Sequence, residues 1–388
     1  MRGERTRQWF WALLPLLLLG GVALAVAETD LTAFLRRGVP PAEDLTVDRA
    51  VLRPGIIVLD VVNGGPDPVT VAQVMVDEAY WDFTITPGAT LPRLGRGTIE
   101  IPYPWVQGEP HLVTLLTSTG LTFTHEIRVA TETPPAGPRY FVLFALVGLY
   151  VGIIPVAIGL MWYPWLRGLE PRWIHFALAL TAGLLIFLGA DTVHEALEAS
   201  SSVAGAFQGV ALVVVGFLGA LLLLDMASRS RVDRTGSEGR RWVAFLIALG
   251  IGLHNLGEGL AIGAAYSLGE AALGAFLIVG FMLHNTTEGL GIVAPIAKDR
   301  PGLATLAGLG LLGGGPTVLG AWIGGLAYSP LFATLFLALG AGAIGQVVLA
   351  LYRVVSREAE GPVWNPLTAG GVLVGLVVMY GTGLLVAV

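Results

Sequence analysis

The sequence predicts an α-helical polytopic membrane protein, with eight transmembrane helices and an N-terminal extracytoplasmic all-β sandwich-like domain. Three observations lead to this fold class. The 388 residues are 54% hydrophobic and only 13% charged, with a mean hydropathy of +0.74, which is above the balance of a soluble domain. Between about residues 45 and 129, apolar and polar residues alternate with period two. After Arg139 the chain resolves into eight apolar segments, each long enough to cross a bilayer core.

Residues 1–27 have the pattern of a signal peptide. The basic start MRGERTRQ precedes the apolar run WFWALLPLLLLGGVALAVA, and its last residues, Ala25-Val26-Ala27, are typical of a cleavage site. An uncleaved anchor is the alternative. In both cases Arg2, Arg5 and Arg7 hold the start of the chain in the cytoplasm, so the chain after residue 28 is delivered outside.

The segment 28–136 is expected to form the extracytoplasmic β-domain. Short runs such as GIIVLDVVN, VTVAQVMV and HLVTLLTS are separated by the turn-forming stretches NGGPDP and STG, as in a small antiparallel sandwich. His111 and His125 are expected at its surface rather than as metal ligands. The Pro-rich stretch TETPPAGPR is a stiff linker that leads into the membrane domain, residues 137–388.

The basic residues predict the orientation of the membrane domain. They fall in every second loop, and the positive-inside rule places those loops in the cytoplasm. The β-domain and the C-terminus then lie outside a cell (inner or plasma) membrane. Three ionisable residues near the cytoplasmic ends are expected to be solvated, namely Asp225, His175 and Asp299. The glycine-rich runs are expected to allow close helix packing. The apolar segments lie near 140–163, 172–197, 203–227, 241–266, 271–297, 303–327, 331–355 and 366–387.

Charge and cysteine content exclude several functional classes. The formal net charge is -6 and the pI is about 5.5, so the chain offers no basic face for a nucleic acid. The sequence contains no cysteine, which excludes disulfides, thiolate metal sites and cysteine nucleophiles.

Ionisable side chains are concentrated in three of the apolar segments. A charged group near the bilayer centre is costly, so each one is a functional hypothesis. The second segment carries Asp191, His194, Glu195 and Glu198, the fourth carries His254, Asn255 and Glu258, and the fifth carries His284, Asn285 and Glu288.

The fourth and fifth segments repeat one motif, HNLGEG and HNTTEG. Residues four apart share a helix face, so each histidine projects with its glutamate. A short outer loop makes the two helices antiparallel, which brings His254 to the depth of Glu288 and Glu258 to that of His284, with about 6 Å between the two levels. Such N and O ligands suit a first-row divalent cation, zinc most readily. A helix-packing role is the alternative for one motif, but the repetition favours a metal site.

The second segment adds an acidic stripe. Its four ionisable residues follow the spacing i, i+3, i+4, i+7, which places them on one face of a helix. Because this segment runs outward, Glu198 lies at the outer mouth and Asp191 two turns deeper. We interpret the stripe as an entry path toward the central site.

These motifs resemble those of the ZIP (Zrt/Irt-like protein) family of divalent metal transporters. HNLGEG and HNTTEG resemble the family's fourth and fifth helices, AGLLIFLGADTVHEALEA resembles its second, and GGGPTVLGAWIGG its sixth. The likeness covers about 139–388 and implies eight helices with both termini outside. The β-domain lies beyond it.

The resemblance also implies roles for particular residues. It implies that His254, Glu258 and Glu288 coordinate the transported ion in a binuclear centre, with Asn255, His284 and Asn285 as neighbours shared between its sites. The sequence departs from the family pattern at three positions. The family often has Pro before each glutamate and Glu before the proline of the sixth helix, where this chain has Gly257, Thr287 and Gly315.

The sequence therefore predicts a transporter, rather than an enzyme, for a divalent metal cation. Zinc is the first candidate, iron and manganese are alternatives, the direction is into the cytoplasm, and no prosthetic group is expected. The expected partners are the cation and the lipid bilayer, and a homodimer is left open. Two rival hypotheses stay open. One is an intramembrane zinc-dependent hydrolase, in which a free carboxylate activates water, and the other is a metal sensor that signals through the β-domain.

Overall fold

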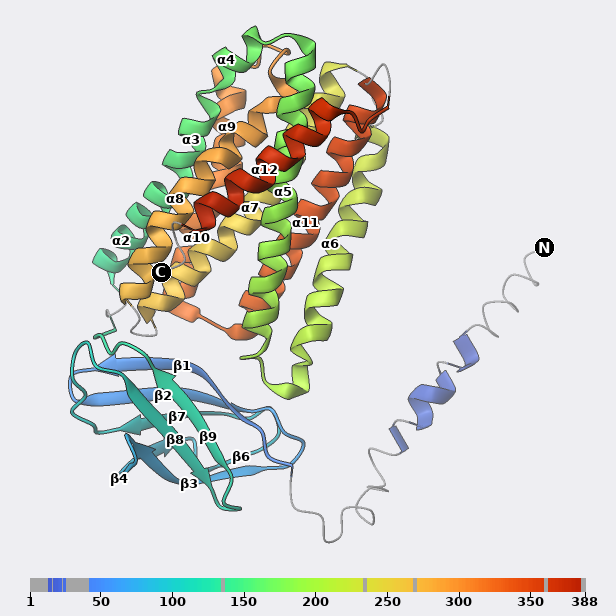
Figure 1. The fold of residues 1–388 in the computed structure, drawn as a ribbon. Helices are drawn as coiled ribbons and strands as arrows, with labels where there is room; N and C mark the ends of the chain where they lie inside the picture. Colours follow the sequence, from blue (N-terminus) through green and yellow to red (C-terminus); the bar gives the residue numbers. More distant parts are fainter. Residues whose placement is uncertain are drawn as a thin grey trace. The chain divides into compact units, whose positions relative to one another are not determined.

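The computed structural model describes residues 42–133, 137–232, 236–267, 271–358 and 362–384, together with 13–15, 17–22 and 24–25. Much of the predicted signal peptide, residues 1–27, therefore lies outside the described residues. Contacts divide the chain into the units Met1–Ala42 and Glu43–Val388. The second unit contains a β-domain and a helical domain (Figure 1).

The β-domain is a sandwich of two antiparallel sheets, as predicted. One sheet has the order β1-β2-β7-β5 and the other β4-β3-β8-β9, with β6 paired to β3. Their inner faces share one apolar core, in which Leu59, Val74 and Leu115 are fully buried. The strands are β1 (Leu45–Arg53), β2 (Ile56–Asn63), β3 (Val69–Val76), β4 (Ala79–Trp81), β5 (Thr84–Thr86), β6 (Thr90–Leu91), β7 (Arg96–Ile101), β8 (His111–Thr117) and β9 (Thr122–Ile127).

A two-residue turn joins β1 to β2. Arg53 pairs with Ile56 across it, and Gly55 has a φ of +72°, a value that glycine adopts without steric cost. Pro54 precedes it with its ring-fixed φ. The Pro-Gly pair therefore sets the hairpin register that points Leu52 and Ile57 into the core.

His111 is buried, which contradicts the prediction that it lies at the surface. Strand β8 alternates inward and outward residues, and His111 lies on its inner side with Val113 and Leu115. Its Nδ1 lies 2.7 Å from Asp77 Oδ2, which also accepts a hydrogen bond of 2.8 Å from the Tyr103 hydroxyl. Asp77 stands in the turn after β3 with a φ of +50°. The tertiary pairing of β3 with β8 brings these residues together.

The helical domain contains long helices that begin at the predicted positions to within a few residues. Pro138, Pro171, Pro330 and Pro366 each open a helix, where a missing N–H is tolerated. The helices are α2 (Pro138–Gly148), α3 (Ile154–Leu160), α4 (Tyr163–Gly168), α5 (Pro171–Ser200), α6 (Gly209–Val232), α7 (Ser237–Ser267), α8 (Ala271–Val293), α9 (Leu303–Gly314), α10 (Pro316–Ala327), α11 (Pro330–Glu358) and α12 (Pro366–Leu384).

Two of the predicted spans are interrupted in their interior, and two others have a 3₁₀ turn at one end. The first contains a π-helical turn, η1 (Leu149–Ile153), between α2 and α3. The sixth is divided into α9 and α10 at Gly315, because Pro316 has no N–H to donate to Leu312. Two short 3₁₀ turns, η2 (Gly205–Phe207) and η3 (Ala294–Ile296), precede α6 and follow α8.

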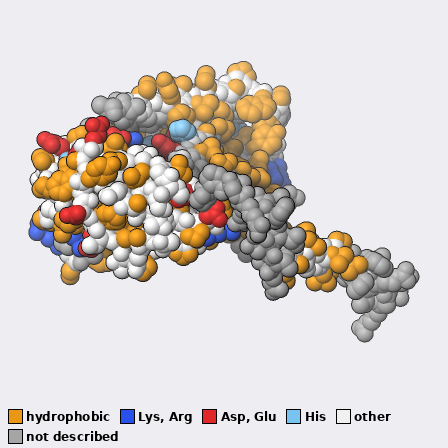
Figure 2. Space-filling model, turned by 90° about the horizontal axis from the view of Figure 1, so that it is seen from below, with side chains coloured by type: hydrophobic (Ala, Val, Ile, Leu, Met, Phe, Trp, Pro, Cys, Tyr) orange, Lys and Arg blue, Asp and Glu red, His pale blue; other side chains and the backbone are white. Residues whose placement is uncertain are grey.

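The chain is a multi-pass membrane protein. Seven helical segments of the described residues are long and apolar enough to cross a membrane. Helix α8, with 23 residues, lies where the fifth span was predicted. Hydrophobic side chains dominate the surface of the helices, whereas acidic and basic side chains are scattered over the β-domain (Figure 2).

Helix α7 lies at the centre of the bundle. In its most apolar stretch 72% of the residues are buried, and it packs against α8, α9, α10 and α11. Helix α5 packs mainly against α11 and α12. A helix buried on most sides can carry charged groups only where neighbouring helices supply partners for them.

The Asp77 network predicts how pH affects the β-domain. Burial would raise the pKa of Asp77, but hydrogen bonds from Leu112 N, His111 and Tyr103 outweigh it and hold this pKa below 3.8. A carboxyl whose folded-state pKa is depressed contributes stability above its unfolded-state pKa, and this contribution is lost as pH falls through the folded-state pKa. We expect Asp77→Asn to lower the free energy of unfolding of the β-domain by about 1 kcal/mol at neutral pH. The effect is small because the Asp77 side chain is 40% exposed.

The measurement is deuterium exchange of the β8 amides in the full-length protein, corrected for the intrinsic rate at each pH. Protection should differ between Asp77→Asn and wild type at pH 7 and converge as pH falls through the lowered folded-state pKa of Asp77. Glu78→Gln, at the exposed neighbouring position, is the control and should match wild type. Equal protection of Asp77→Asn and wild type at pH 7 would contradict the assigned role of Asp77.

Candidate metal centre

Helices α7 and α8 bring two histidines and a glutamate to one buried point. Glu258 Oε1 accepts a hydrogen bond from His284 Nε2, across the helix pair, and lies 3.2 Å from His254 Nε2, one turn away on α7. One ligand atom from each of His254, Glu258 and His284 lies within 4.8 Å of the others. The side chains of His254 and Glu258 are at most 2% exposed, and that of His284 is 12% exposed. Two nitrogens and one oxygen are a ligand set suited to zinc.

The two asparagines of the repeated motif hold the opposite glutamates. Asn255 Nδ2 donates to Glu288 Oε2 at 3.1 Å and to the Gly313 carbonyl at 3.0 Å. Asn285 Nδ2 donates to Glu258 Oε2 at 2.9 Å and to the Val151 carbonyl at 2.9 Å. Each amide therefore fixes a carboxylate of the neighbouring helix and also bonds to the backbone of a third. The acceptor Val151 belongs to the π-helical turn η1.

The two halves of the centre are not equivalent. Glu258 gathers both imidazoles, whereas Glu288 lies outside the three-residue group. Several buried polar atoms have no hydrogen-bond partner among the described residues, namely Glu288 Oε1, Asn255 Oδ1, Asn285 Oδ1, Thr317 Oγ1 and His254 Nε2. Most are acceptors, and an acceptor that is buried without a donor costs about 1–3 kcal/mol. The carboxylate and amide oxygens among them are atoms of a kind that binds cations.

Thr192 on α5 contacts the second ring nitrogen of His254. Its Oγ1 lies 2.8 Å from His254 Nδ1, and both residues are buried. Sequence reasoning did not single out Thr192, because a threonine in an apolar helix is common and usually bonds to its own backbone. Its position among Asp191, His194 and Glu195 is the only signal that the sequence offers.

The acidic stripe of α5 only partly approaches the centre. Glu195 is partly buried and interacts electrostatically with His254, Glu258 and His284. Asp191 interacts with Glu195 and is exposed, as are His194 and Glu198. The structure therefore places Glu195 within electrostatic range of the centre, outside the three-residue group, and leaves the other three members of the stripe at the surface of α5.

Glycines allow α10 to approach α7 beside the centre. A Cβ atom at Gly259 would lie 2.2 Å from the Thr317 carbonyl oxygen, and one at Gly320 would lie 2.1 Å from that of Leu256. Gly263 and Gly324 repeat the contact one turn further. The glycine-rich run of the sixth span therefore serves close helix packing, as predicted. Both α7 and α8 continue as α-helices through Gly257 and Thr287.

Two carboxylates near the predicted cytoplasmic ends are buried, which contradicts the prediction that they are solvated. The side chain of Asp299, after η3, is 3% exposed and accepts two hydrogen bonds from Arg240 of α7. Asp225 of α6 lies 2.5 Å from Arg353 Nη1 of α11. Each acid is paired with an arginine far away in the sequence, so local hydropathy could not show its burial. His175 is partly buried.

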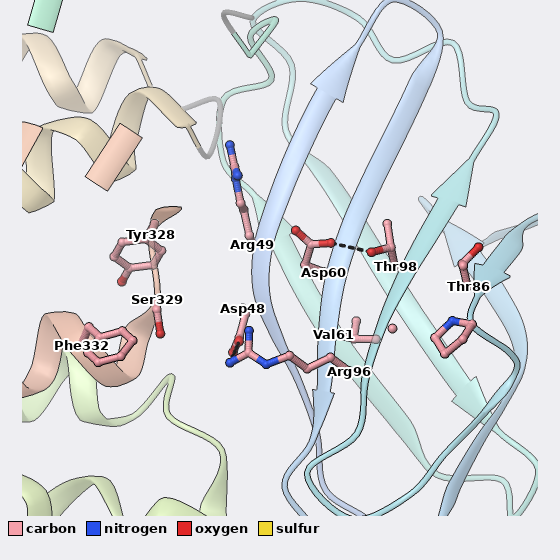
Figure 3. Close-up of a pocket in the computed structure, with 12 residues that line it drawn as sticks. Asp48, Arg49, Asp60, Val61, Thr86, Arg96, Thr98, Tyr328, Ser329 and Phe332 are labelled. Carbon is pink, nitrogen blue, oxygen red and sulfur yellow. Dashed lines mark hydrogen bonds and ion pairs between the residues drawn. The ribbon is translucent and has the colours of Figure 1, made fainter. Parts of the chain in front are cut away.

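A pocket of about 540 Å³ lies between the β-domain and the connection from α10 to α11. In Figure 3, Asp48, Asp60 and Arg96 project from the strands toward Tyr328, Ser329 and Phe332. Burial raises the pKa of Asp48, Arg96 at 3.4 Å lowers it, and Asp60 raises it further. Arg49 donates to the Leu326 carbonyl at 3.2 Å, near the end of α10. The pocket therefore presents both signs of charge.

Comparisons with known proteins leave the site to be judged on its geometry. No family model matches the chain, and no curated protein matches it.

The glycine contacts generate a prediction about stability. Gly259→Ala should lower the stability of the helical domain by about 1–3 kcal/mol, because the new methyl group would overlap the backbone of α10. Gly308→Ala in α9 is the control, since a Cβ there meets nothing within 4 Å. The midpoint of thermal unfolding of the detergent-solubilised protein measures both. A Gly259→Ala midpoint equal to or above that of Gly308→Ala would show that α7 and α10 are not in close contact.

Proposed function

We propose that this protein transports a divalent metal cation across the membrane through the His/Glu centre of α7 and α8. The observation that carries the proposal is the convergence of His254, Glu258 and His284 in the interior of an apolar bundle. Ionisable groups at such depth are costly. A cation that binds between them compensates the carboxylate charge and gives the imidazole nitrogens a partner.

Zinc is the first candidate for the cargo. Imidazole nitrogen and carboxylate oxygen are both good zinc ligands, and three protein ligands leave a fourth position for water or an entering group. Iron and manganese accept the same atoms and are the alternatives. An incomplete protein ligand set also favours exchange of the ion, which a transport site requires and a structural site does not.

The arrangement of charges supports a direction for transport. The loops rich in Lys and Arg are assigned to the cytoplasm by the positive-inside rule, so the β-domain and the C-terminus are assigned to the outside of the cell membrane. In this orientation Glu198 and His194 lie toward the outer end of α5, and Glu195 lies beside the centre. The ion then enters along this stripe, binds at Glu258, and leaves toward the cytoplasm.

The proposal predicts zinc uptake by liposomes that contain the purified protein and a trapped zinc-sensitive dye. Glu258→Gln should lower the uptake rate by at least about 100-fold, since loss of a partner of a metal ligand already costs about 10–100-fold. Glu126→Gln, the same change at an exposed position of β9, should leave the rate unchanged.

Absence of uptake of zinc, iron and manganese by the wild-type protein would refute the proposal. A Glu258→Gln protein with the wild-type rate would refute the assignment of the centre.

A further inference from the structure

The hydroxyl of Thr192 makes two short contacts that bear on which nitrogen of His254 carries a proton. Thr192 Oγ1 lies 2.7 Å from the Leu188 carbonyl oxygen and 2.8 Å from His254 Nδ1. A hydroxyl has one proton to donate, and a carbonyl oxygen can only accept. The hydroxyl proton therefore goes to Leu188. The short contact with His254 is then a hydrogen bond in which Nδ1–H donates and the Thr192 oxygen accepts.

This assignment leaves a lone pair on the other nitrogen. A neutral imidazole with a proton on Nδ1 has none on Nε2. His254 Nε2 lies 3.2 Å from Glu258 Oε1, yet it is buried and makes no hydrogen bond among the described residues. Because Thr192 occupies Nδ1, Nε2 is the nitrogen of His254 that faces Glu258 Oε1 and can bind a cation.

The separation of these two atoms fits a metal ion. Zinc binds imidazole nitrogen at about 2.0–2.1 Å and carboxylate oxygen at about 2.0–2.2 Å in a tetrahedral arrangement, which places two ligand atoms about 3.4 Å apart. The observed 3.2 Å is close to this value. Nε2 and Oε1 are therefore close enough to bind one ion without a large movement of either side chain.

We propose that Thr192 is a positioning residue, which selects Nε2 of His254 as the metal-binding atom and holds the ring at the spacing that the ion requires. This proposal rests on the proposed function, in that it assumes a metal ion at the centre. Thr192 belongs to α5, which packs mainly against α11 and α12, whereas the ligands belong to α7 and α8. The affinity of the centre therefore depends on a residue outside the two helices that carry the ligands.

The test compares three substitutions in the purified full-length protein. Thr192→Val keeps the shape of the side chain and removes the acceptor, and Thr192→Ser keeps the hydroxyl. Thr181→Val is the matched control. Thr181 is also a fully buried threonine of α5, and its hydroxyl donates to Ala177, four residues before it. It lies 11 residues, slightly more than three turns, before Thr192 on α5.

Two properties are measured, the Kd for zinc by competition with a chelating dye and the visible absorption spectrum of the Co²⁺-loaded protein. Thr192→Val should raise the Kd by about 10–100-fold and change the Co²⁺ spectrum, because His254 loses the partner that fixes its tautomer. Thr192→Ser should restore both properties, and Thr181→Val should leave both unchanged.

Three results would overturn the role of Thr192. The first is a Thr192→Val protein whose Kd and Co²⁺ spectrum match those of wild type. The second is a Thr181→Val protein that changes both properties as much as Thr192→Val does. The third is a Thr192→Ser protein that melts at the wild-type temperature but does not recover wild-type zinc binding. Failure of the transport proposal can be distinguished from failure of the Thr192 proposal, because the wild-type protein would then bind zinc tightly without zinc uptake by the liposomes. A wild-type protein that binds neither ion would overturn both proposals.

Discussion

The burial of one carboxylate, Glu258, is the constraint on which the rest of the helical domain depends. Its two oxygens accept from His284 and Asn285, and His254 lies one helical turn away. In an apolar bundle water does not stabilise a charge, so each of these partners has to come from a helix. That requirement explains why α8 lies against α7 at this level. It also explains why Asn285 is tied to the π-helical turn of the first span.

A helix that is surrounded on most sides can pack closely against its neighbours only if some of its faces carry small residues. On α7, the ligand face carries His254, Asn255 and Glu258, and the adjacent face carries Gly259 and Gly263. The glycines let the backbone of α10 lie against that of α7. Helix α9, which directly precedes α10 in the chain, supplies the Gly313 carbonyl that accepts from the Asn255 amide. Close packing of one half of the sixth span and orientation of Asn255 by the other half therefore meet on the same helix, α7.

Much of this arrangement could be predicted from the sequence because it follows from short-range periodicity. Alternation in the strands and long apolar runs identified the two domains, and the i, i+4 spacing identified His254 with Glu258. Features that depend on partners distant in the chain could not be predicted. His111, Asp225 and Asp299 are buried because Asp77, Arg353 and Arg240 lie beside them in the fold. The π-helical turn and the contact between Thr192 and His254 depend on packing between helices, which hydrophobic periodicity does not report.

The repeated motif does not produce two equal half-sites, and its surroundings explain why. Of the two histidines, His254 is the one that Thr192 contacts among the described residues, and its Nε2 lies 3.2 Å from the glutamate of its own helix. His284 turns to the same carboxylate, and Glu288 has the Asn255 amide as its partner while its Oε1 has none among the described residues. Gly315, which has no side chain, stands where the ZIP pattern often has a glutamate. The repeat thus brings two imidazoles and one carboxylate together, and it leaves the Glu288 Oε1 atom without a hydrogen bond among the described residues, at the cost of an unpaired buried oxygen.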